Sequence, residues 1–249
     1  MTDQEEEFFD IKGMVVVLCS PTYGPADPIC VKSLRAAIMF ASNIGVLWAG
    51  DVSPDKVAYG AARNTGVQYT FKNTPQADGM LWVDSDIKPR IGDVARILDC
   101  VRRNKIDFVT GVYHQRTGYF NPVFHIWNPD LHCYQPCADY PANVLGHADG
   151  CGFGFVYTSL KMLRDMTLLE EFDPKTGWFP DRRDTGGFGE DLSFCWMAKK
   201  AGYQLFVDSG TQVGHLGEPV FIGEEDFRRK QKEWYETIAE EQKPHAWGV

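Results

Sequence analysis

The sequence predicts an α/β domain whose mainly parallel, mixed sheet is flanked by helices. Short apolar runs of strand length alternate with longer segments of helical periodicity along most of the chain. The first run, 14–18, is apolar at every position, which is typical of a strand buried on both faces of a parallel sheet. No repeat, low-complexity block or linker rich in proline, glycine and serine divides the sequence.

Composition narrows the class of protein. A hydrophobic content of 44% and a charged content of 24% are typical of a soluble globular protein. The formal net charge of -9 gives no general attraction to nucleic acid or anionic membrane. We expect residues 1–11 to form a flexible acidic tail and 12–249 to form one domain. No apolar stretch reaches the roughly 18 residues of a membrane span, and the seven scattered cysteines with no secretory signal at the start indicate a cytoplasmic protein with reduced thiols.

The first half of the chain supplies most of the predicted sheet. A loop marked by Pro21 and Gly24 follows the first strand. The elements expected next are a helix over 29–40, a strand over 44–48 that ends at Gly50-Asp51, a helix over 55–71 with Val57, Ala61, Ala62 and Tyr69 inward, a strand over 80–83, a helix over 92–103 with Val94, Ile97, Leu98 and Val101 on one face, and a strand over 108–112.

The second half begins with a long segment, 113–150, that is rich in aromatic residues, proline, histidine and asparagine. We expect it to be irregular and functional rather than a second domain. Its aromatic residues Tyr119, Phe120, Phe124 and Trp127 could stack on sugar rings or bases, or pack beneath the loop. The elements expected after it are a strand over 153–157, a helix over 159–166, a helix from Glu190 with Leu192, Cys195, Trp196 and Lys199 on one face, a strand over 203–207, and a charged helix over 224–241 with Phe227, Trp234 and Ile238 as its buried stripe.

The sequence Asp84-Ser85-Asp86 directly follows the apolar strand 80–83. In sheets of this kind ligands bind beyond the carboxyl ends of the strands. Two carboxylates flanking a small residue can hold one hard cation, which can bridge the phosphates of a nucleotide diphosphate. The alternative is a solvated turn in which both acids cap the chain.

Two further features carry possible chemistry. Glu190 and Asp191 follow a glycine-rich loop at the start of a predicted helix, where one of them could act as a general base. The alternative is that both only complement the helix dipole. His215 stands among glycines after a strand; an imidazole beside carboxylates suits manganese or another first-row divalent metal, although a structural, hydrogen-bonded histidine is the alternative.

The three features follow one another along the chain as an acid pair (Asp84 and Asp86), a second acid pair (Glu190 and Asp191) and a histidine (His215). With this order the sequence resembles the GT-A glycosyltransferases, especially their large family-two-like group, from about Val15 to Gly217. The resemblance implies a GT-A-like α/β domain. It also implies that Asp84, Asp86 and His215 hold a metal ion, Mn²⁺ or Mg²⁺. Of the acid pair, Asp191 would be the usual base and Glu190 the alternative.

The resemblance also implies contacts to the two substrates. On the donor side it assigns the nucleoside to the opening strand and loop, Val17 to Tyr23, and places Arg63 of Ala62-Arg63-Asn64 toward the diphosphate. The full donor-binding set is Pro21, Thr22, Tyr23, Asp51, Arg63, Asp84 and Ser85. The acceptor loop of the group is matched by Asp149, Gly150, Cys151 and Gly152. The segment 113–147 has no counterpart in the group.

The function expected from these residues is metal-dependent transfer of a sugar, with inversion, from a nucleotide-sugar donor to an acceptor hydroxyl. A UDP-sugar is the favoured donor. The acceptor stays open between a glycan, a small metabolite, a protein and a modified DNA base. Two alternatives remain: a non-catalytic nucleotide-sugar or carbohydrate-binding protein, and a sugar nucleotidyltransferase. The nucleotidyltransferases begin with a Gly-x-Gly-x-Arg loop, which Ser20-Pro21-Thr22-Tyr23-Gly24 does not supply.

Overall fold

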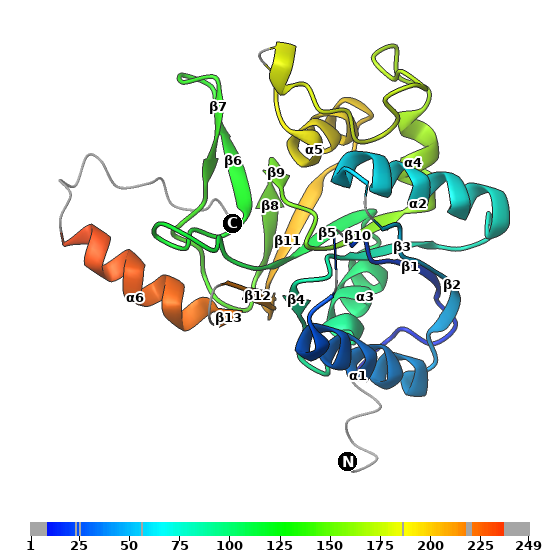
Figure 1. The fold of residues 1–249 in the computed structure, drawn as a ribbon, viewed down its shortest axis with the longest axis horizontal. Helices are drawn as coiled ribbons and strands as arrows, with labels where there is room; N and C mark the ends of the chain where they lie inside the picture. The colour runs from blue at the N-terminus through cyan, green and yellow to red at the C-terminus, as the bar shows by residue number, and fades with distance from the viewer. Residues whose placement is uncertain are drawn as a thin grey trace.

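A computed structural model describes residues 9–22, 24, 26–55, 57–185, 187–217 and 221–236. Its centre is a mixed sheet of seven strands (Figure 1). In spatial order these are β2 (Leu47–Val52), β1 (Val15–Cys19), β3 (Gly79–Val83), β10 (Phe155–Ser159), β5 (Phe108–Val112), β11 (Leu205–Gln212) and β8 (Leu145–Ala148). Only β10 and β8 run against the others, so the predicted mainly parallel, mixed sheet is confirmed.

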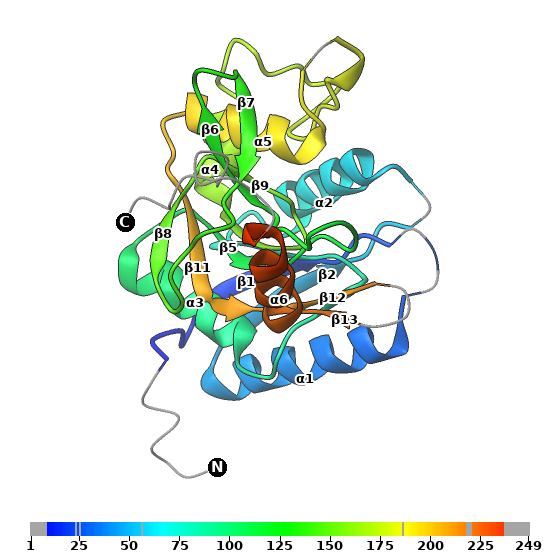
Figure 2. The ribbon, with the colours of Figure 1, turned by 90° about the vertical axis from the view of Figure 1, so that its left-hand side faces the viewer.

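Helices cover both faces of this sheet (Figures 1 and 2). One face packs against α1 (Pro28–Ile44) and α3 (Asp93–Asn104), and the other against α2 (Tyr59–Asn73), α4 (Leu160–Met166) and α5 (Glu190–Lys200). Successive side chains of a strand point to opposite faces. In β1, Val16 and Leu18 therefore join the first core, whereas Val17 and Cys19 join the second.

The ends of α1 show how local sequence sets a helix boundary. The carboxylate of Asp27 accepts hydrogen bonds from the backbone N–H groups of Ile29 and Cys30, at 2.7 and 3.2 Å. Gly45 ends the helix with a φ of 110°, a left-handed conformation that glycine adopts without strain. The helix therefore continues four residues beyond the predicted end at residue 40.

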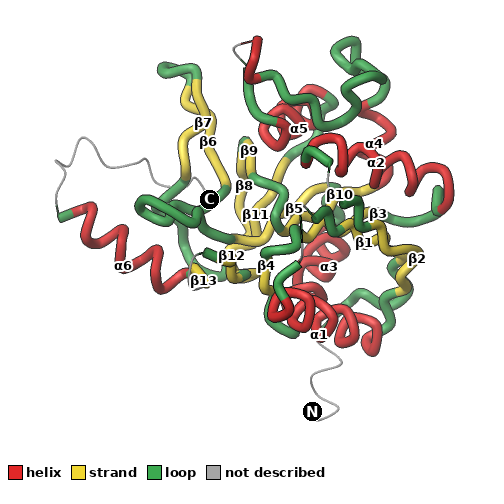
Figure 3. The backbone as a smooth tube through the Cα atoms, viewed as in Figure 1, coloured by secondary structure: helices red, strands yellow, loops and turns green. Residues whose placement is uncertain are grey.

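Two small sheets lie beside the main one (Figure 3). The first joins β13 (Phe221–Ile222), β12 (Gly214–Leu216) and β4 (Ile87–Lys88), and the second joins β7 (Cys133–Pro136), β6 (Phe124–Asn128) and β9 (Gly150–Cys151). The β6–β7 hairpin projects next to α5 in both ribbon views. The final helix α6 (Glu224–Tyr235) buries Phe227, whose ring stacks on His114 with centroids 4.9 Å apart.

Several sequence-based expectations about elements were wrong. The segment 113–150 is not irregular, because β6, β7 and β8 form within it. β8 pairs with β11 and β6 pairs with β9, and local sequence does not reveal these partners. The second strand lies at Leu47–Val52 rather than 44–48, because α1 extends into the predicted strand. The strand predicted over 153–157 is the antiparallel β10, two residues later, and the one predicted over 203–207 is Leu205–Gln212.

Inward-facing residues were predicted with mixed success. The face of α3 is confirmed, since Val94, Ile97, Leu98 and Val101 are all buried. The helix predicted over 55–71 is Tyr59–Asn73, so Val57 lies before it and is 41% exposed. Within α2 only Ala62 of the predicted set is buried; Tyr69 is 43% exposed, because Arg63, Gly66 and Val67 occupy the covered face instead. The structure describes α6 only to Tyr235, so Ile238 and the predicted stretch to 241 lie outside the described residues.

Of the predicted tail, residues 1–8 lie outside the described part, while Ile11 is fully buried in the core. In the described residues no helix combines the length and the hydropathy that a membrane crossing requires.

Candidate active site

A cleft of about 660 Å³ opens where β3 and β5 end. It is lined by all six charged or histidine residues of the predicted motifs: Arg63, Asp84, Asp86, Glu190, Asp191 and His215. They come from α2, the turn after β3, the start of α5, and β12. Segments more than a hundred residues apart in sequence therefore meet in one site.

Asp84 and Asp86 owe their position to β3. All five residues of this strand are buried, so its end is rigidly placed at the edge of the core. The backbone N–H of Asp84 donates to the carbonyl of Gly154 at 3.0 Å, and the N–H of Ile87 donates to the carbonyl of Asp84 at 3.0 Å. These bonds close a tight turn that presents both carboxylates to the cleft.

Arg63 joins the two acidic motifs. Its Nη2 donates to both carboxylate oxygens of Asp84 at 3.2 Å, and its Nη1 donates to Oδ1 of Asp191 at 2.6 Å. The Oε1 atom of Glu190 lies 3.7 Å from the same Nη1. Only 2% of the Arg63 side chain is exposed, so its guanidinium is shielded from water, whereas the carboxylates of Asp84 and Asp191, 20% and 27% exposed, face the cleft.

Aromatic rings complete the surroundings of Arg63. The rings of Tyr59, Phe153 and Phe179 lie 5.5 to 5.8 Å from its guanidinium carbon, within cation–π range. Burial opposes the charged guanidinium, but the charges of Asp191 and Asp84 outweigh it and hold the pKa of Arg63 above its usual range. Arg63 is therefore a fixed positive charge inside the molecule.

The carboxylates respond to the same environment. Burial raises the pKa of Asp191 above the ordinary aspartate value, and the guanidinium of Arg63 counteracts only part of that effect. Burial likewise raises the pKa of Asp84 against the influence of Arg63. Both side chains are thus more basic than a solvated aspartate, a property that suits proton transfer.

His215 reaches the site through strand pairing. β12 pairs antiparallel with β4, which places His215 opposite Ile87, and the N–H of Leu216 donates to the carbonyl of Asp86 at 2.9 Å. The ring of Tyr113 stands edge-on to the imidazole, with centroids 5.3 Å apart. Antiparallel pairing of these two short strands thus brings a residue from late in the chain to Asp86.

The protonation of His215 follows from its partners. Nδ1 lies 2.7 Å from the carbonyl oxygen of His114, which can only accept, so Nδ1 carries the proton. The lone pair on Nε2 then faces the cleft, 3.6 Å from Oδ2 of Asp86. Burial lowers the pKa of His215, which favours the neutral imidazole that a metal ion requires.

Arg116 occupies the space between these two side chains. Its guanidinium forms an ion pair with Asp86, and its Nε donates to Nε2 of His215 at 2.9 Å. About half of the Arg116 side chain is exposed. A cationic group therefore already sits where Asp86 and His215 would direct a metal ion.

The donor set fits a divalent cation of the manganese or magnesium class. Four carboxylates face two guanidinium groups across the cleft, leaving two negative charges that one such ion would neutralise. The tautomer of His215, fixed by a backbone carbonyl, is the one that metal-ligating histidines use. Within the described residues, however, no three His, Cys, Asp or Glu side chains are already gathered as a complete metal cluster. Asp84 is turned toward Arg63 instead.

The other donor-binding predictions remain untested. Asp51 is exposed on β2, where its carboxylate accepts a hydrogen bond from Ser53. Thr22 donates to Asp55 at 3.1 Å. The remaining members of the set, Pro21 and Ser85, do not line the cleft either, and Tyr23 lies outside the described residues.

The predicted acceptor loop has clear packing roles. Oδ2 of Asp149 accepts a hydrogen bond from the N–H of Trp127 at 2.7 Å, and its other oxygen forms an ion pair with Lys199. A Cβ on Gly150 would stand 2.7 Å from the side chain of Leu192. At Gly152 it would collide with the hydroxyl of Tyr113. Cys151 is fully buried, so a direct acceptor contact by these residues stays a prediction.

The prediction missed half of the lining: Tyr59, Tyr113, Gln115, Arg116, Thr117 and Val123. Four of these directly follow β5, whose carboxyl end lies at the same edge as that of β3. The rule that ligands bind beyond carboxyl ends therefore applied to this loop as well. Local sequence did not reveal the loop conformation that turns Arg116 toward Asp86.

Comparison with known proteins gives similarity only at the level of structure. No family model and no curated protein sequence matches the chain. The viral protein A197 from STIV superposes with a TM-score of 0.55 at 14% identity, covering 86% of this chain and 92% of that one. GalNAc-T7, solved with UDP, GalNAc and Mn²⁺, superposes with a TM-score of 0.52 at 8% identity, covering 81% of this chain but 43% of its own.

The catalytic domain of Drosophila β1,4-galactosyltransferase 7, solved with xylobiose, gives a TM-score of 0.45 at 14% identity, covering 82% of this chain and 71% of that one. That likeness adds nothing to the assignment. The first two superpositions extend over more than four fifths of the chain. The chain therefore has the GT-A fold that its sequence predicts.

Proposed function

We propose that this protein is a metal-dependent glycosyltransferase that moves a sugar from a nucleotide-sugar donor to an acceptor hydroxyl, with inversion at the anomeric carbon. The observation that carries the proposal is the convergence of Asp84, Asp86, Asp191 and His215 on one cleft. As separate motifs each had an ordinary structural explanation. Their meeting at the carboxyl end of β3, in a GT-A fold, favours the functional explanation for all of them.

The identity of donor and metal is inferred by analogy with GalNAc-T7, which was solved with UDP, GalNAc and Mn²⁺. This chain spans less than half of the length of that protein. On this basis we infer a UDP-sugar donor and Mn²⁺, or Mg²⁺, as the cofactor. The surplus of two negative charges in the cleft supports a divalent ion.

Asp86 and the Nε2 atom of His215 would hold the metal ion, with Asp84 beside them. When bound, the ion supplies positive charge next to the diphosphate, where negative charge develops as the nucleotide leaves. Arg63 keeps Asp84 in place from the protein side. Because Arg116 contacts both Asp86 and His215, an ion held there would take its place, and its guanidinium would then be available to an anionic substrate group.

Asp191 is the candidate general base. Arg63 and the N–H of Phe153, which lies 3.3 Å from Oδ2, orient its carboxylate. Because burial raises the pKa of Asp191, it accepts the proton of the acceptor hydroxyl more readily than a solvated aspartate would. Base action during attack on the anomeric carbon gives a single displacement and hence inversion. Glu190, 3.7 Å from Arg63, is the alternative base.

The test is a screen of nucleotide-sugars for Mn²⁺-dependent donor hydrolysis, followed by transfer assays with candidate acceptors. Asp86→Asn should abolish donor hydrolysis, and Asp191→Asn should lower transfer by about a hundredfold or more. Asp99→Asn is a matched control, since Asp99 pairs with Arg103 on the surface of α3 and should leave both activities unchanged.

Two results would count against the proposal. Donor binding without turnover in the wild type would favour a non-catalytic nucleotide-sugar-binding protein. A product that retains the anomeric configuration of the donor, measured by NMR, would remove the role of Asp191 as the base while leaving transfer itself intact.

A further inference from the structure

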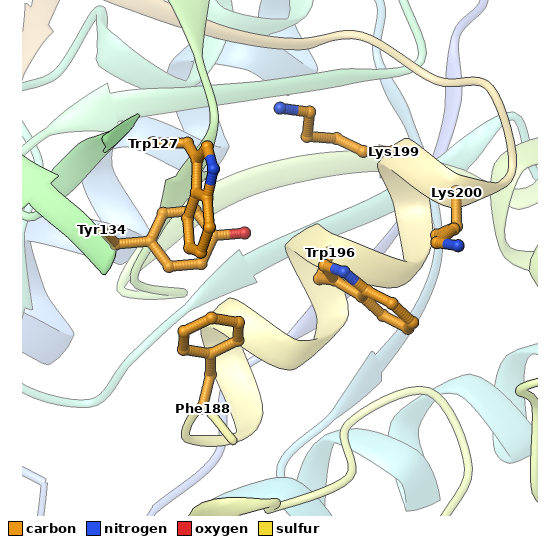
Figure 4. Close-up of a pocket in the computed structure, with 6 residues that line it drawn as sticks. All are labelled: Trp127, Tyr134, Phe188, Trp196, Lys199 and Lys200. Atoms are coloured by element: carbon orange, nitrogen blue, oxygen red, sulfur yellow. The ribbon is translucent and has the colours of Figure 1, made fainter. Parts of the chain in front are cut away.

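A second cavity, lined mainly by aromatic side chains, lies between the β6–β7 hairpin and α5. Its volume is about 410 Å³, and its lining residues are Trp127, Tyr134, Phe188, Trp196, Lys199 and Lys200. Figure 4 shows the rings of Trp127 and Tyr134 on one side of the space and Trp196 with the two lysines on the other. Nothing in the chemistry proposed above uses this pocket.

Three of the rings hold each other in fixed orientations. Tyr134 and Phe188 meet edge to face with centroids 4.8 Å apart, and Trp127 contacts Tyr134 at 5.2 Å and Phe188 at 5.9 Å. All three are half-buried, so each keeps part of its surface open. Mutual packing fixes the rotamers before any ligand arrives, which reduces the entropy lost on binding.

Polar contacts of Asp149 join the hairpin to the helix. Asp149 accepts a hydrogen bond from the backbone of Trp127 and forms an ion pair with Lys199 of α5. Gly150 leaves no room for a side chain between Leu192 and Tyr134, so the hairpin approaches α5 closely. The pocket is therefore preformed and does not depend on closure of a loop.

The charges at the rim are compensated. Lys199 pairs with Asp149, and Lys200 lies 3.5 Å from Glu171. Each lysine thus has a carboxylate beside it, and the chain carries a net charge of -9. A polyanion would gain little here, whereas neutral hydroxyl groups can both donate to carboxylates and accept from ammonium groups.

The pocket and the catalytic cleft are both lined by residues at or near the start of α5. Phe188 precedes Glu190 by two residues, and the pocket then follows the helix to Trp196 and Lys199. With a rise of about 1.5 Å per residue, Trp196 lies roughly 7 to 8 Å along the axis from Asp191. Phe188, three residues before Asp191, is the lining residue nearest to it along the chain, so a ligand that reaches from Phe188 toward Asp191 would span both sites.

We propose that this pocket binds a neutral sugar ring of an acceptor glycan, one unit removed from the hydroxyl that receives the transferred sugar. The apolar face of a pyranose stacks on Trp127, Tyr134 and Phe188, while its hydroxyl groups meet the lysine–carboxylate pairs at the rim. This inference rests on the proposed function, because it specifies the acceptor of that reaction. On this inference the β6–β7 hairpin recognises the acceptor.

The experiment measures binding of short cello-, malto-, xylo- and chito-oligosaccharides to the full chain by calorimetry and tryptophan fluorescence, without donor. We expect at least one of them to bind, and Trp127→Leu to raise its Kd by about tenfold or more, equivalent to about 1.4 kcal/mol. Phe188→Leu is a second pocket variant that should weaken binding in the same direction. Trp48→Leu, on the distant edge strand β2, is the matched control and should leave Kd unchanged. Circular dichroism and thermal unfolding establish that each variant is folded.

Donor hydrolysis separates failure of this inference from failure of the proposed function. Hydrolysis needs the metal cleft but no acceptor, so Trp127→Leu should retain it. If the wild type hydrolyses a donor yet binds none of the oligosaccharides, the acceptor inference alone is overturned. Tighter binding of single-stranded oligodeoxynucleotides, or self-association of the chain that Trp127→Leu abolishes, would also overturn it. A wild type without metal-dependent hydrolysis would instead refute the proposed function.

Discussion

Replacing Arg116 with alanine should tighten the binding of Mn²⁺ to the protein in the absence of nucleotide. The guanidinium of Arg116 contacts both Asp86 and Nε2 of His215, so a metal ion that binds these two atoms must first displace it. Displacing the guanidinium costs the free energy of its contacts with Asp86 and His215, and this cost weakens the binding of the metal ion. Removing the side chain removes that cost.

The size of the effect follows from the exposure of Arg116. Its side chain is 49% exposed, so solvent screens the ion pair and the pair counts for no more than about 1 kcal/mol. The hydrogen bond to His215 adds a similar amount, about 1 kcal/mol. A total of about 1–2 kcal/mol corresponds to a decrease in Kd of about five- to thirtyfold.

Titration calorimetry, or electron paramagnetic resonance of free Mn²⁺, measures this Kd without any turnover. Arg103→Ala is the matched control, because Arg103 is similarly exposed and pairs with Asp99 on the surface of α3. Its Kd for Mn²⁺ should equal that of the wild type. An unchanged or weaker Kd in Arg116→Ala would refute the idea that Arg116 occupies the metal position.

Three further substitutions test the packing around the site. Arg63→Met should lower the free energy of unfolding by about 3–5 kcal/mol, because the partly buried carboxylates of Asp84 and Asp191 would lose the positive charge that offsets theirs; a loss in urea unfolding below about 1 kcal/mol would contradict the network. Gly152→Ala should cost about 1–3 kcal/mol in the same assay through overlap with Tyr113, and a neutral effect would show that the loop relaxes freely. Burial alone would raise the pKa of Glu224, but hydrogen bonds from His114 and Tyr140 lower it to about 2. The ionised form of Glu224 therefore stabilises the fold above its ordinary pKa of 4.5, and this contribution is lost as pH falls toward 2. Glu224→Gln should therefore be less stable at neutral pH by roughly 2 kcal/mol and should lose less stability than the wild type between pH 5 and 3; parallel acid-unfolding curves would refute this.

Local sequence was informative where the physical signal is itself local. The buried strand 79–83 has five buried residues in a row, and the acids after it could be placed at its carboxyl end without any knowledge of partners. The covered face of α3 followed from helical periodicity, because burial there depends only on which residues share a face. Both kinds of information require no more than a dozen consecutive residues.

Predictions failed where long-range pairing decides the outcome. The hairpin of β6 and β7 forms in a segment whose composition suggests a loop, because β9 supplies the hydrogen bonds for its inner edge. The covered face of α2 contains a buried arginine, which hydrophobic periodicity cannot anticipate. Burial of Arg63 is favourable only because carboxylates from two other segments meet it.

The sequence by itself therefore determined the class of fold and the residue types that carry the proposed chemistry. Alternation of apolar runs specifies a layered sheet, and the acids and histidine are visible one by one. Only the tertiary structure decided that Asp86 and His215 are neighbours, that Arg63 ties the acid pairs together, and that Arg116 stands in the place of a cation. The physical reason is that charges interact through space: a salt bridge between residues 63 and 191 leaves no periodic trace along the chain, whereas the burial of a strand does.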